Sequence, residues 1–141
     1  MNIRLATQKD VQTIVKLMLD EFSQPPFNED VSLEAVVKSL NFYFDIGRVF
    51  VAEKDEIVGV CVFKVEQWWQ GKVIIIEDLA IKEAFKEHKL HLQLLEHVEQ
   101  HAQKIGACKV CFTTHKDTPN LDEYKLIGYK SEDNVFMSKK V

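Results

Sequence analysis

A stretch in the middle of the chain, residues 73–95, switches from one hydrophobic pattern to another within a few positions. Its first part, VIIIEDLAI, is aliphatic apart from two acids, which predicts a strand buried on both faces. A short basic loop and the start of an amphipathic helix follow. Because backbone N–H groups converge where a helix begins, and three lysines and two histidines lie in or beside this junction, we predict that it binds an anion.

The hydrophobic periods on either side of this junction predict one α/β (α+β) domain over residues 1–141. Thr7 and Asp10 form a capping-box pattern for the first helix, which Pro25 and Pro26 end. The expected order is β-α-α-β-β-β-α-β-α-β-β, with strands near 3–5, 48–53, 56–66, 73–81, 107–114, 128–132 and 134–140, and helices near 8–22, 32–44, 89–105 and 121–126. We expect strands 73–81 and 107–114 to lie parallel and adjacent.

Composition narrows the classes of function. The net charge is −4 and only Arg4 and Arg48 are arginines, so we expect no nucleic-acid partner. No apolar run reaches the length of a membrane span, and we expect no membrane partner. The three cysteines and an N-terminus without a secretory pattern favour a cytoplasmic protein.

Three pieces of the sequence together resemble the GCN5-related N-acetyltransferase (GNAT) family. They are IRLATQKDVQTIVKLM at the start, IEDLAI before the long helix, and YKLIGY near the end. The resemblance implies a mixed, mostly antiparallel sheet whose one central parallel pair splays apart. It also implies acetyl-CoA as cosubstrate, no metal, and direct attack by a primary amine of a small molecule or peptide.

The resemblance also assigns roles to residues. Glu77, partly desolvated after four aliphatic residues, would act as general base, and Tyr124 would protonate the departing thiolate. The backbone of Leu79, Ala80 and Ile81 would run along pantetheine. The family's pyrophosphate loop, Arg/Gln-x-x-Gly-x-Gly/Ala, falls on Lys86, Glu87, His88, Lys89, Leu90 and His91, so both glycines are replaced, by Lys89 and His91. The N–H donors survive, whereas the new side chains take up room.

Several alternatives stay open. A chain of this fold that has lost or altered CoA binding would be a binding or regulatory module rather than an enzyme. Trp68 and Trp69 could wall a substrate groove, join two copies as a homodimer, or pack over the sheet edge. Cys108 and Cys111, three apart on a strand, point to opposite faces, and His97 with His101 has no evident third metal ligand. The acceptor would be set by residues 23–28, the Trp68–Trp69 turn and the loop after Thr114, where Glu29, Asp30 and Asp117 hint at a cation.

Overall fold

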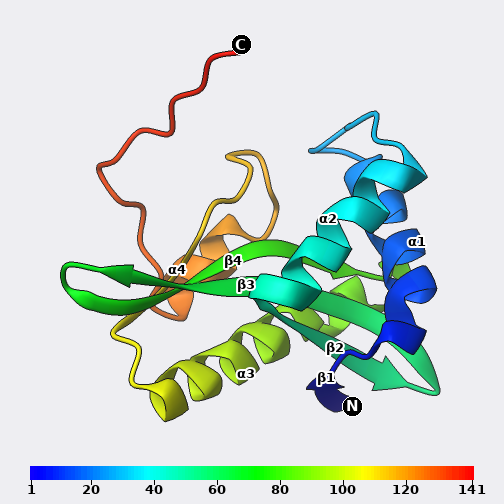
Figure 1. Cartoon of the computed structure of the whole chain (residues 1–141), viewed down its shortest axis with the longest axis horizontal. Coiled ribbons are helices and arrows are strands. Elements are labelled where there is room, and N and C mark those ends of the chain that lie inside the picture. Colours follow the sequence, from blue (N-terminus) through cyan, green and yellow to red (C-terminus); the bar gives the residue numbers. More distant parts are fainter.

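The computed structural model describes all residues from Met1 to Val141 and contains one five-stranded sheet (Figure 1). The strand order is β1-β2-β3-β4-β5, and every neighbouring pair is antiparallel except β4 with β5. The strands are β1 Asn2–Leu5, β2 Arg48–Lys54, β3 Glu56–Trp68, β4 Gly71–Ile81 and β5 Lys109–Phe112. The helices are η1 Gln8–Asp10, α1 Val11–Phe22, α2 Leu33–Ile46, η2 Glu83–His88, α3 Leu90–Ile105 and α4 Leu121–Leu126. The predicted fold class is confirmed.

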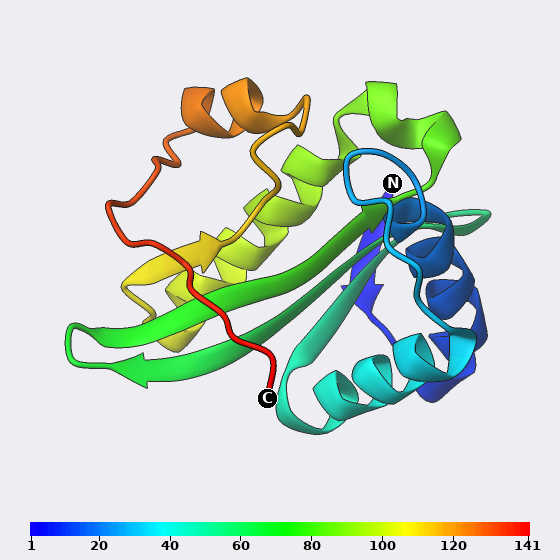
Figure 2. The ribbon, with the colours of Figure 1, turned by 90° about the horizontal axis from the view of Figure 1, so that it is seen from above.

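Helices cover both faces of the sheet, α1 and α2 on one and α3 with α4 on the other (Figure 2). Alternation along the strands explains the two cores, because neighbouring side chains point to opposite faces. On β2, Val49 and Val51 pack toward α1 and α2, whereas Phe50 and Ala52 pack toward α3. Each helix therefore buries one apolar stripe against a different set of strand residues.

The helix boundaries follow from local capping. The N–H of Thr7 donates to a carboxylate oxygen of Asp10 at 2.8 Å, which confirms the capping box. Ser32 accepts a hydrogen bond from the N–H of Ala35 at 3.1 Å and so caps α2. Gly106 ends α3 with φ +72°, a conformation that suits glycine.

The parallel strands β4 and β5 pair over only four residues, and they separate beyond that point. Register runs only from Val73 opposite Lys109 to Ile76 opposite Phe112. Beyond Ile76, β4 continues to Ile81 paired with β3 alone, while the chain after Phe112 leaves the sheet. The predicted splaying of the central pair is confirmed, and it leaves one edge of residues 77–81 without a neighbouring strand.

Two predictions about strands were wrong. The strands expected near 128–132 and 134–140 do not form, and the segment from Ser131 to Val141 is exposed throughout. Alternation suggested those strands, but the two segments pair neither with each other nor with the outer edge of β5, so no ladder forms. The strand expected at 107–114 is confined to Lys109–Phe112, because β4 offers it only four partners. No helix is both long and apolar enough to cross a membrane.

Candidate active site

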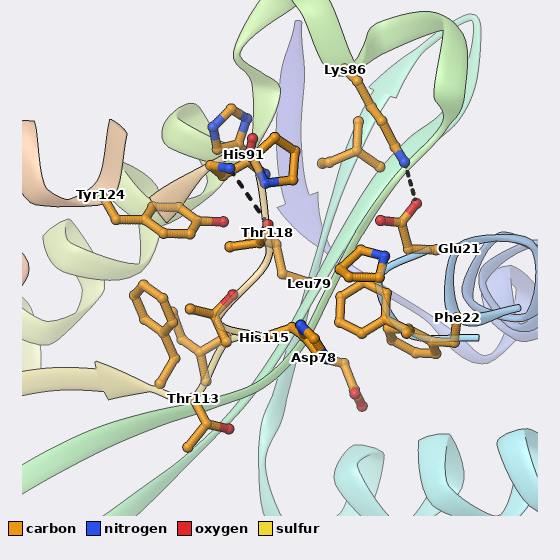
Figure 3. A pocket seen from close by; sticks show the side chains of 18 of the residues that line it. Glu21, Phe22, Asp78, Leu79, Lys86, His91, Thr113, His115, Thr118 and Tyr124 are labelled. Carbon is orange, nitrogen blue, oxygen red and sulfur yellow. Dashed lines mark hydrogen bonds and ion pairs between the residues drawn. The ribbon is translucent and has the colours of Figure 1, made fainter. Parts of the chain in front are cut away.

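A cavity of about 430 Å³ fills the space where β4 and β5 separate (Figure 3). Its walls come from the second half of β4, the end of α1 with the loop after it, residues 112–120, and α4. Tyr124 and His91 lie on one side of the cavity, and the Lys86–Glu21 ion pair lies on the opposite side. Elements distant in the sequence thus meet at the splayed strands.

A β-bulge on β4 brings two consecutive acids to this cavity. Val62 of β3 lies opposite Asp78 and Phe63 lies opposite Ile76, so Glu77 is the extra residue of the bulge. In a regular strand, neighbouring side chains point to opposite faces, whereas a bulge redirects one of them. Both Glu77 and Asp78 line the cavity as a result.

The two acids differ in their surroundings. Glu77 pairs with Lys64, whose Nζ lies 2.9 Å from its Oε1 atom. Asp78 has no ion pair and no hydrogen-bonded side-chain partner, although it lies close to Glu77 and Glu29. Burial, reinforced by those two negative charges, raises the pKa of Asp78 to about 6. A carboxylate with that pKa is ionised at neutral pH and is ready to accept a proton.

Tyr124 is the aromatic residue that α4 contributes. Its side chain is only 6% exposed, its ring meets that of Phe112 edge-on at 5.0 Å, and its hydroxyl points toward the cavity (Figure 3). Burial raises the pKa of this phenol, opposed in part by a hydrogen bond with Asn120. Tyr124 is therefore protonated at neutral pH and suited to donate a proton.

His91 joins the start of α3 to α4. It is 4% exposed, and its Nε2 atom lies 2.6 Å from an oxygen of Glu123, the residue before Tyr124. The imidazole also packs edge-on against the Tyr124 ring at 5.8 Å. Lys89 adds a longer contact to Glu123 at 3.5 Å. The contact between His91 and Glu123 holds α4, the short helix that carries Tyr124.

The segment predicted as a phosphate loop is divided between the 3₁₀ helix η2, which holds residues 86–88, and the start of α3 at Leu90. Lys89 follows η2 with φ +55° and ψ +33°, the left-handed conformation that a glycine adopts without strain. Lys86 joins η2 to α1 at one side of the cavity, and its Nζ lies 2.8 Å from Glu21 of α1 and 3.0 Å from Glu83. The charge of Lys86 is thus already partnered.

The structure brings some of the predicted residues together and not others. The predicted residues that line the cavity are Glu77, Leu79, Ile81, Lys86, His91 and Tyr124. Ala80 points to the α1 and α2 face, Leu90 is buried under the sheet, and the side chains of Glu87, His88 and Lys89 are exposed outside the cavity. Alternation along β4 and the outward turn of η2 account for this division.

Sequence reasoning missed several residues of the site. Asp78 was visible as the second of two acids, but only the bulge shows that it shares a cavity with Glu77. Glu21 and Phe22 belong to a helix that gave no sign of reaching the site. Glu29 does line the cavity as the acidic loop suggested, whereas Asp30 and Asp117 do not.

The remaining candidates have structural surroundings of their own. His97 and His101 pack edge-on against Phe50, at 4.6 and 5.9 Å between ring centroids. The cysteines are all free, and no group of three or more histidine, cysteine or acidic side chains could hold a metal ion. Trp68 donates to Glu66 at 2.8 Å with Lys109 over its ring, so it packs at the sheet edge, while Trp69 is fully exposed.

Comparison with protein-family models places most of the chain in one family. Residues 12–129 match the model of the acetyltransferase (GNAT) family. No curated protein matches.

Three solved structures illustrate the likeness in fold. A possible acetyltransferase from Clostridium difficile 630 has a TM-score of 0.84 and 15% identity, over 99% of this chain and 97% of that one. Aminoglycoside N-acetyltransferase AAC(6')-Iy in complex with CoA has a TM-score of 0.81 and 14% identity, over 99% and 93%. A transcriptional regulator from Bacillus halodurans C-125 has a TM-score of 0.78 and 22% identity, over 98% and 99%.

Proposed function

The chain belongs to the acetyltransferase (GNAT) family, and from this premise we propose that it moves acetyl from acetyl-CoA to a primary amine in the cavity between β4 and β5. The main observation behind the proposal is that a candidate base and a candidate acid line the same cavity. An unpaired carboxylate with a raised pKa, Asp78, lines it together with a protonated phenol, Tyr124. Transfer of an acyl group to an amine would use such a base to take a proton from the amine and such an acid to give one to the leaving thiolate.

Asp78 is the better placed of the two acids to act as the base. An amine reaches the site mostly as ammonium and must lose a proton before its lone pair can attack the thioester carbonyl. Asp78 can take that proton, directly or through water, since nothing else binds its carboxylate. Glu77, the base that the family resemblance implies, is held by Lys64 and raises the pKa of Asp78. In this chain Glu77 would support the base rather than serve as it.

Tyr124 would complete the reaction as the acid. When the amine nitrogen forms its bond to the carbonyl carbon and the carbon–sulfur bond breaks, the sulfur leaves as a thiolate. The phenolic proton of Tyr124 neutralises that thiolate, and the proton held by Asp78 returns to solvent or to the phenolate. The products are the N-acetylated amine and free CoA.

The residues present fit CoA as a substrate, although Lys86, the lysine that lines the cavity, is already paired with a carboxylate. The open edge of β4 carries Leu79 and Ile81, whose backbone would run along pantetheine as the family resemblance implies. The first N–H groups of α3, at Leu90 and His91, have no partner within the helix and suit a pyrophosphate. Lys86 would supply charge only after leaving Glu21. CoA is also the ligand named for the AAC(6')-Iy structure.

The acceptor side of the cavity favours a cation. Asp78, Glu77 and Glu29 give this wall its negative charge, and Phe22 and Phe27 lie beside it with ring centroids 5.6 Å apart. Carboxylates attract an ammonium group, and aromatic faces stabilise it further. A small basic amine is therefore the acceptor we propose, a class that includes the aminoglycosides named for AAC(6')-Iy.

The test is to incubate the protein with acetyl-CoA and a panel of amines while following release of the free CoA thiol. We expect thiol release that depends on a cationic primary amine, with Y124F and D78N each slowing it about a hundredfold or more. If the natural chain binds acetyl-CoA but releases no thiol with any amine, the proposed acetyltransferase activity is refuted.

A second candidate is a non-catalytic binding module. The observation in its favour is that Lys86 and Lys89 are both partnered by carboxylates and that side chains replace both loop glycines. A transcriptional regulator shares the fold. Calorimetry separates the two candidates, since the module would show no heat with acetyl-CoA until glycine is restored at positions 89 and 91.

A further inference from the structure

The active-site cavity between β4 and β5 is lined by a single lysine and by no arginine. That lysine is Lys86, and its Nζ atom lies 2.8 Å from Oε2 of Glu21, which lines the same cavity. Glu29, Glu77 and Asp78 are the other carboxylates of the cavity wall. The one lysine available to an anion in the cavity is therefore bound by a carboxylate that could itself bind a cation there.

The two members of this ion pair differ in what each keeps when the pair breaks. Lys86 has a second partner, Glu83, at 3.0 Å, whose side chain is 74% exposed and lies outside the cavity. Glu21 has a side chain that is 17% exposed and forms no other ion pair or side-chain hydrogen bond. Loss of Lys86 leaves Glu21 as a partly buried carboxylate without a counter-charge, which is unfavourable until a cation replaces the lysine.

A phosphate that binds Lys86 would break the pair. Lys86 lies in η2, shortly before the first turn of α3, whose first N–H groups suit the same phosphate. A phosphate and Glu21 compete for one ammonium group and repel each other as like charges. Glu21 therefore turns away from an occupied phosphate site, and the cavity that it lines is the space open to it.

The surroundings of Glu21 in the cavity suit a positive charge. Phe22 follows it at the end of α1, and the ring of Phe22 meets that of Phe27 edge-on at 5.6 Å. Both rings line the cavity, and Figure 3 shows Glu21 and Phe22 on the side opposite Tyr124. A carboxylate beside aromatic rings attracts an ammonium group. An ammonium group bound here would lie away from Tyr124, the proposed acid.

We propose that Glu21 exchanges partners as the substrates bind. It leaves Lys86 when a phosphate of CoA takes that lysine, and it then binds a second cationic group of the acceptor. The acceptor accordingly carries two positive charges, one on the amine that is acetylated and one held by Glu21. This exchange rests on the acetyltransferase function proposed above, which supplies both the phosphate and the amine.

The exchange couples the two substrates. In the free chain a diamine must break the pair of Lys86 and Glu21 by itself, whereas CoA bound at Lys86 has already broken it. A diamine therefore binds more tightly when CoA is present, and CoA binds more tightly when the diamine is present, because such coupling is reciprocal. An amine with one positive charge gains nothing from Glu21, because its charge lies beside Asp78.

Calorimetry with two matched amines tests the exchange. The probes are cadaverine, a five-carbon diamine, and aminopentanol, in which a hydroxyl group replaces the second ammonium group. Each is titrated into the full chain with and without saturating free CoA, which carries the phosphates but no acetyl group, so no turnover occurs. We expect CoA to lower the Kd of cadaverine about fivefold or more, and that of aminopentanol by less than about twofold.

Two variants separate the exchange from a change in overall charge. E21Q removes the carboxylate, so it should bind CoA more tightly and lose the gain in cadaverine affinity that CoA produces. E83Q removes the other partner of Lys86 and keeps Glu21, so it is the matched control and should retain that gain. A purely structural role for Glu21 would not strengthen the binding of one substrate while weakening that of the other.

An E21Q variant that keeps the full gain would overturn the exchange, as would a natural chain that binds CoA but shows no gain for cadaverine. A natural chain that binds no CoA at all would overturn the acetyltransferase function together with the exchange. The two failures are distinguishable, because only the second abolishes the heat of CoA binding.

Discussion

The imidazole of His91 and the carboxylate of Glu123 lie 2.6 Å apart and join the start of α3 to the short helix α4. His91 belongs to the first turn of α3, a long helix packed on the sheet. Glu123 belongs to α4, which has six residues and follows an irregular loop. The contact therefore fixes the position of α4, the helix that carries Tyr124, relative to the long helix α3.

Removing this contact should cost stability. In E123A the buried imidazole of His91 loses its partner, and we expect the free energy of unfolding at pH 7 to fall by about 1–2 kcal/mol. E123Q keeps an oxygen that can accept from His91 and should lose less. Urea unfolding measures both. E87A, at an exposed acid near the same helix start, is the control, and equal unfolding free energies for E123A and E87A would contradict the bridging role.

The pH dependence of the proposed reaction should separate the two acids on the bulge. As Asp78 becomes protonated below pH 6 it can no longer accept a proton, so kcat/KM should fall on the acid side with an apparent pKa of about 6. Glu77 helps to raise that pKa, so E77Q should keep most activity and move the acid limb to lower pH. D78N should lose a hundredfold or more at pH 8. Loss of activity in E77Q, with D78N near normal, would make Glu77 the base.

Asp78 should also destabilise the fold at neutral pH. Its pKa is about 6 in the folded protein against 3.8 for the free side chain, so the folded state binds more protons between those values and stability declines as pH rises through 6. D78N removes this penalty. We expect it to raise the free energy of unfolding at pH 8 by on the order of 1–3 kcal/mol, with the gain vanishing below pH 4. A D78N variant no more stable than the natural chain at pH 8 would show that the carboxylate is not desolvated.

Local patterns in the sequence predicted most elements, and interactions between distant segments account for what they missed. Thr7 with Asp10, Ser32 and Gly106 act within one turn of the chain, so the helix ends they mark were predictable. The strands expected at 128–132 and 134–140 would need each other or the outer edge of β5 as a partner, and the structure pairs them with neither. Alternation can predict that a segment suits a strand, but not where its ladder partner is.

The site was predictable in part for the same reason. Tyr124 and Glu77, which both line the cavity, were predicted because short motifs mark them. Asp78 shares the cavity only because β4 bulges against β3, and Glu21 only because the end of α1 lies across from η2. Both relationships join segments far apart in the chain, so no short stretch of sequence predicts either of them.

Lys89 provides a test of the altered loop. Its φ of +55° is strained for a residue with a Cβ atom, so K89G should relieve about 1 kcal/mol of strain and offset the greater flexibility of glycine in the unfolded chain. We expect its free energy of unfolding to equal or exceed that of the natural chain, and its CoA affinity to rise. K16G, at an exposed position inside α1, should cost about 1 kcal/mol. Equal losses for K89G and K16G would contradict the strain.

Glu21 should limit the affinity for CoA through its ion pair with Lys86. The Nζ atom of Lys86 is 2.8 Å from Glu21 and 3.0 Å from Glu83, but Glu21 has the more buried side chain, 17% exposed against 74% for Glu83. An exposed pair is worth little, whereas the pair with Glu21 competes directly with an anionic ligand for the same ammonium group. A phosphate that engages Lys86 must first displace this carboxylate.

E21Q should therefore tighten binding of acetyl-CoA by about threefold to tenfold, equivalent to about 0.7–1.4 kcal/mol, as measured by calorimetry at low salt. The gain should shrink as salt is added, because screening weakens the competing pair. E83Q makes the same change of net charge beside the same lysine and should alter Kd less than twofold. If E83Q and E21Q improve binding equally, the effect is one of overall charge, and the contact between Lys86 and Glu21 has no special part in it.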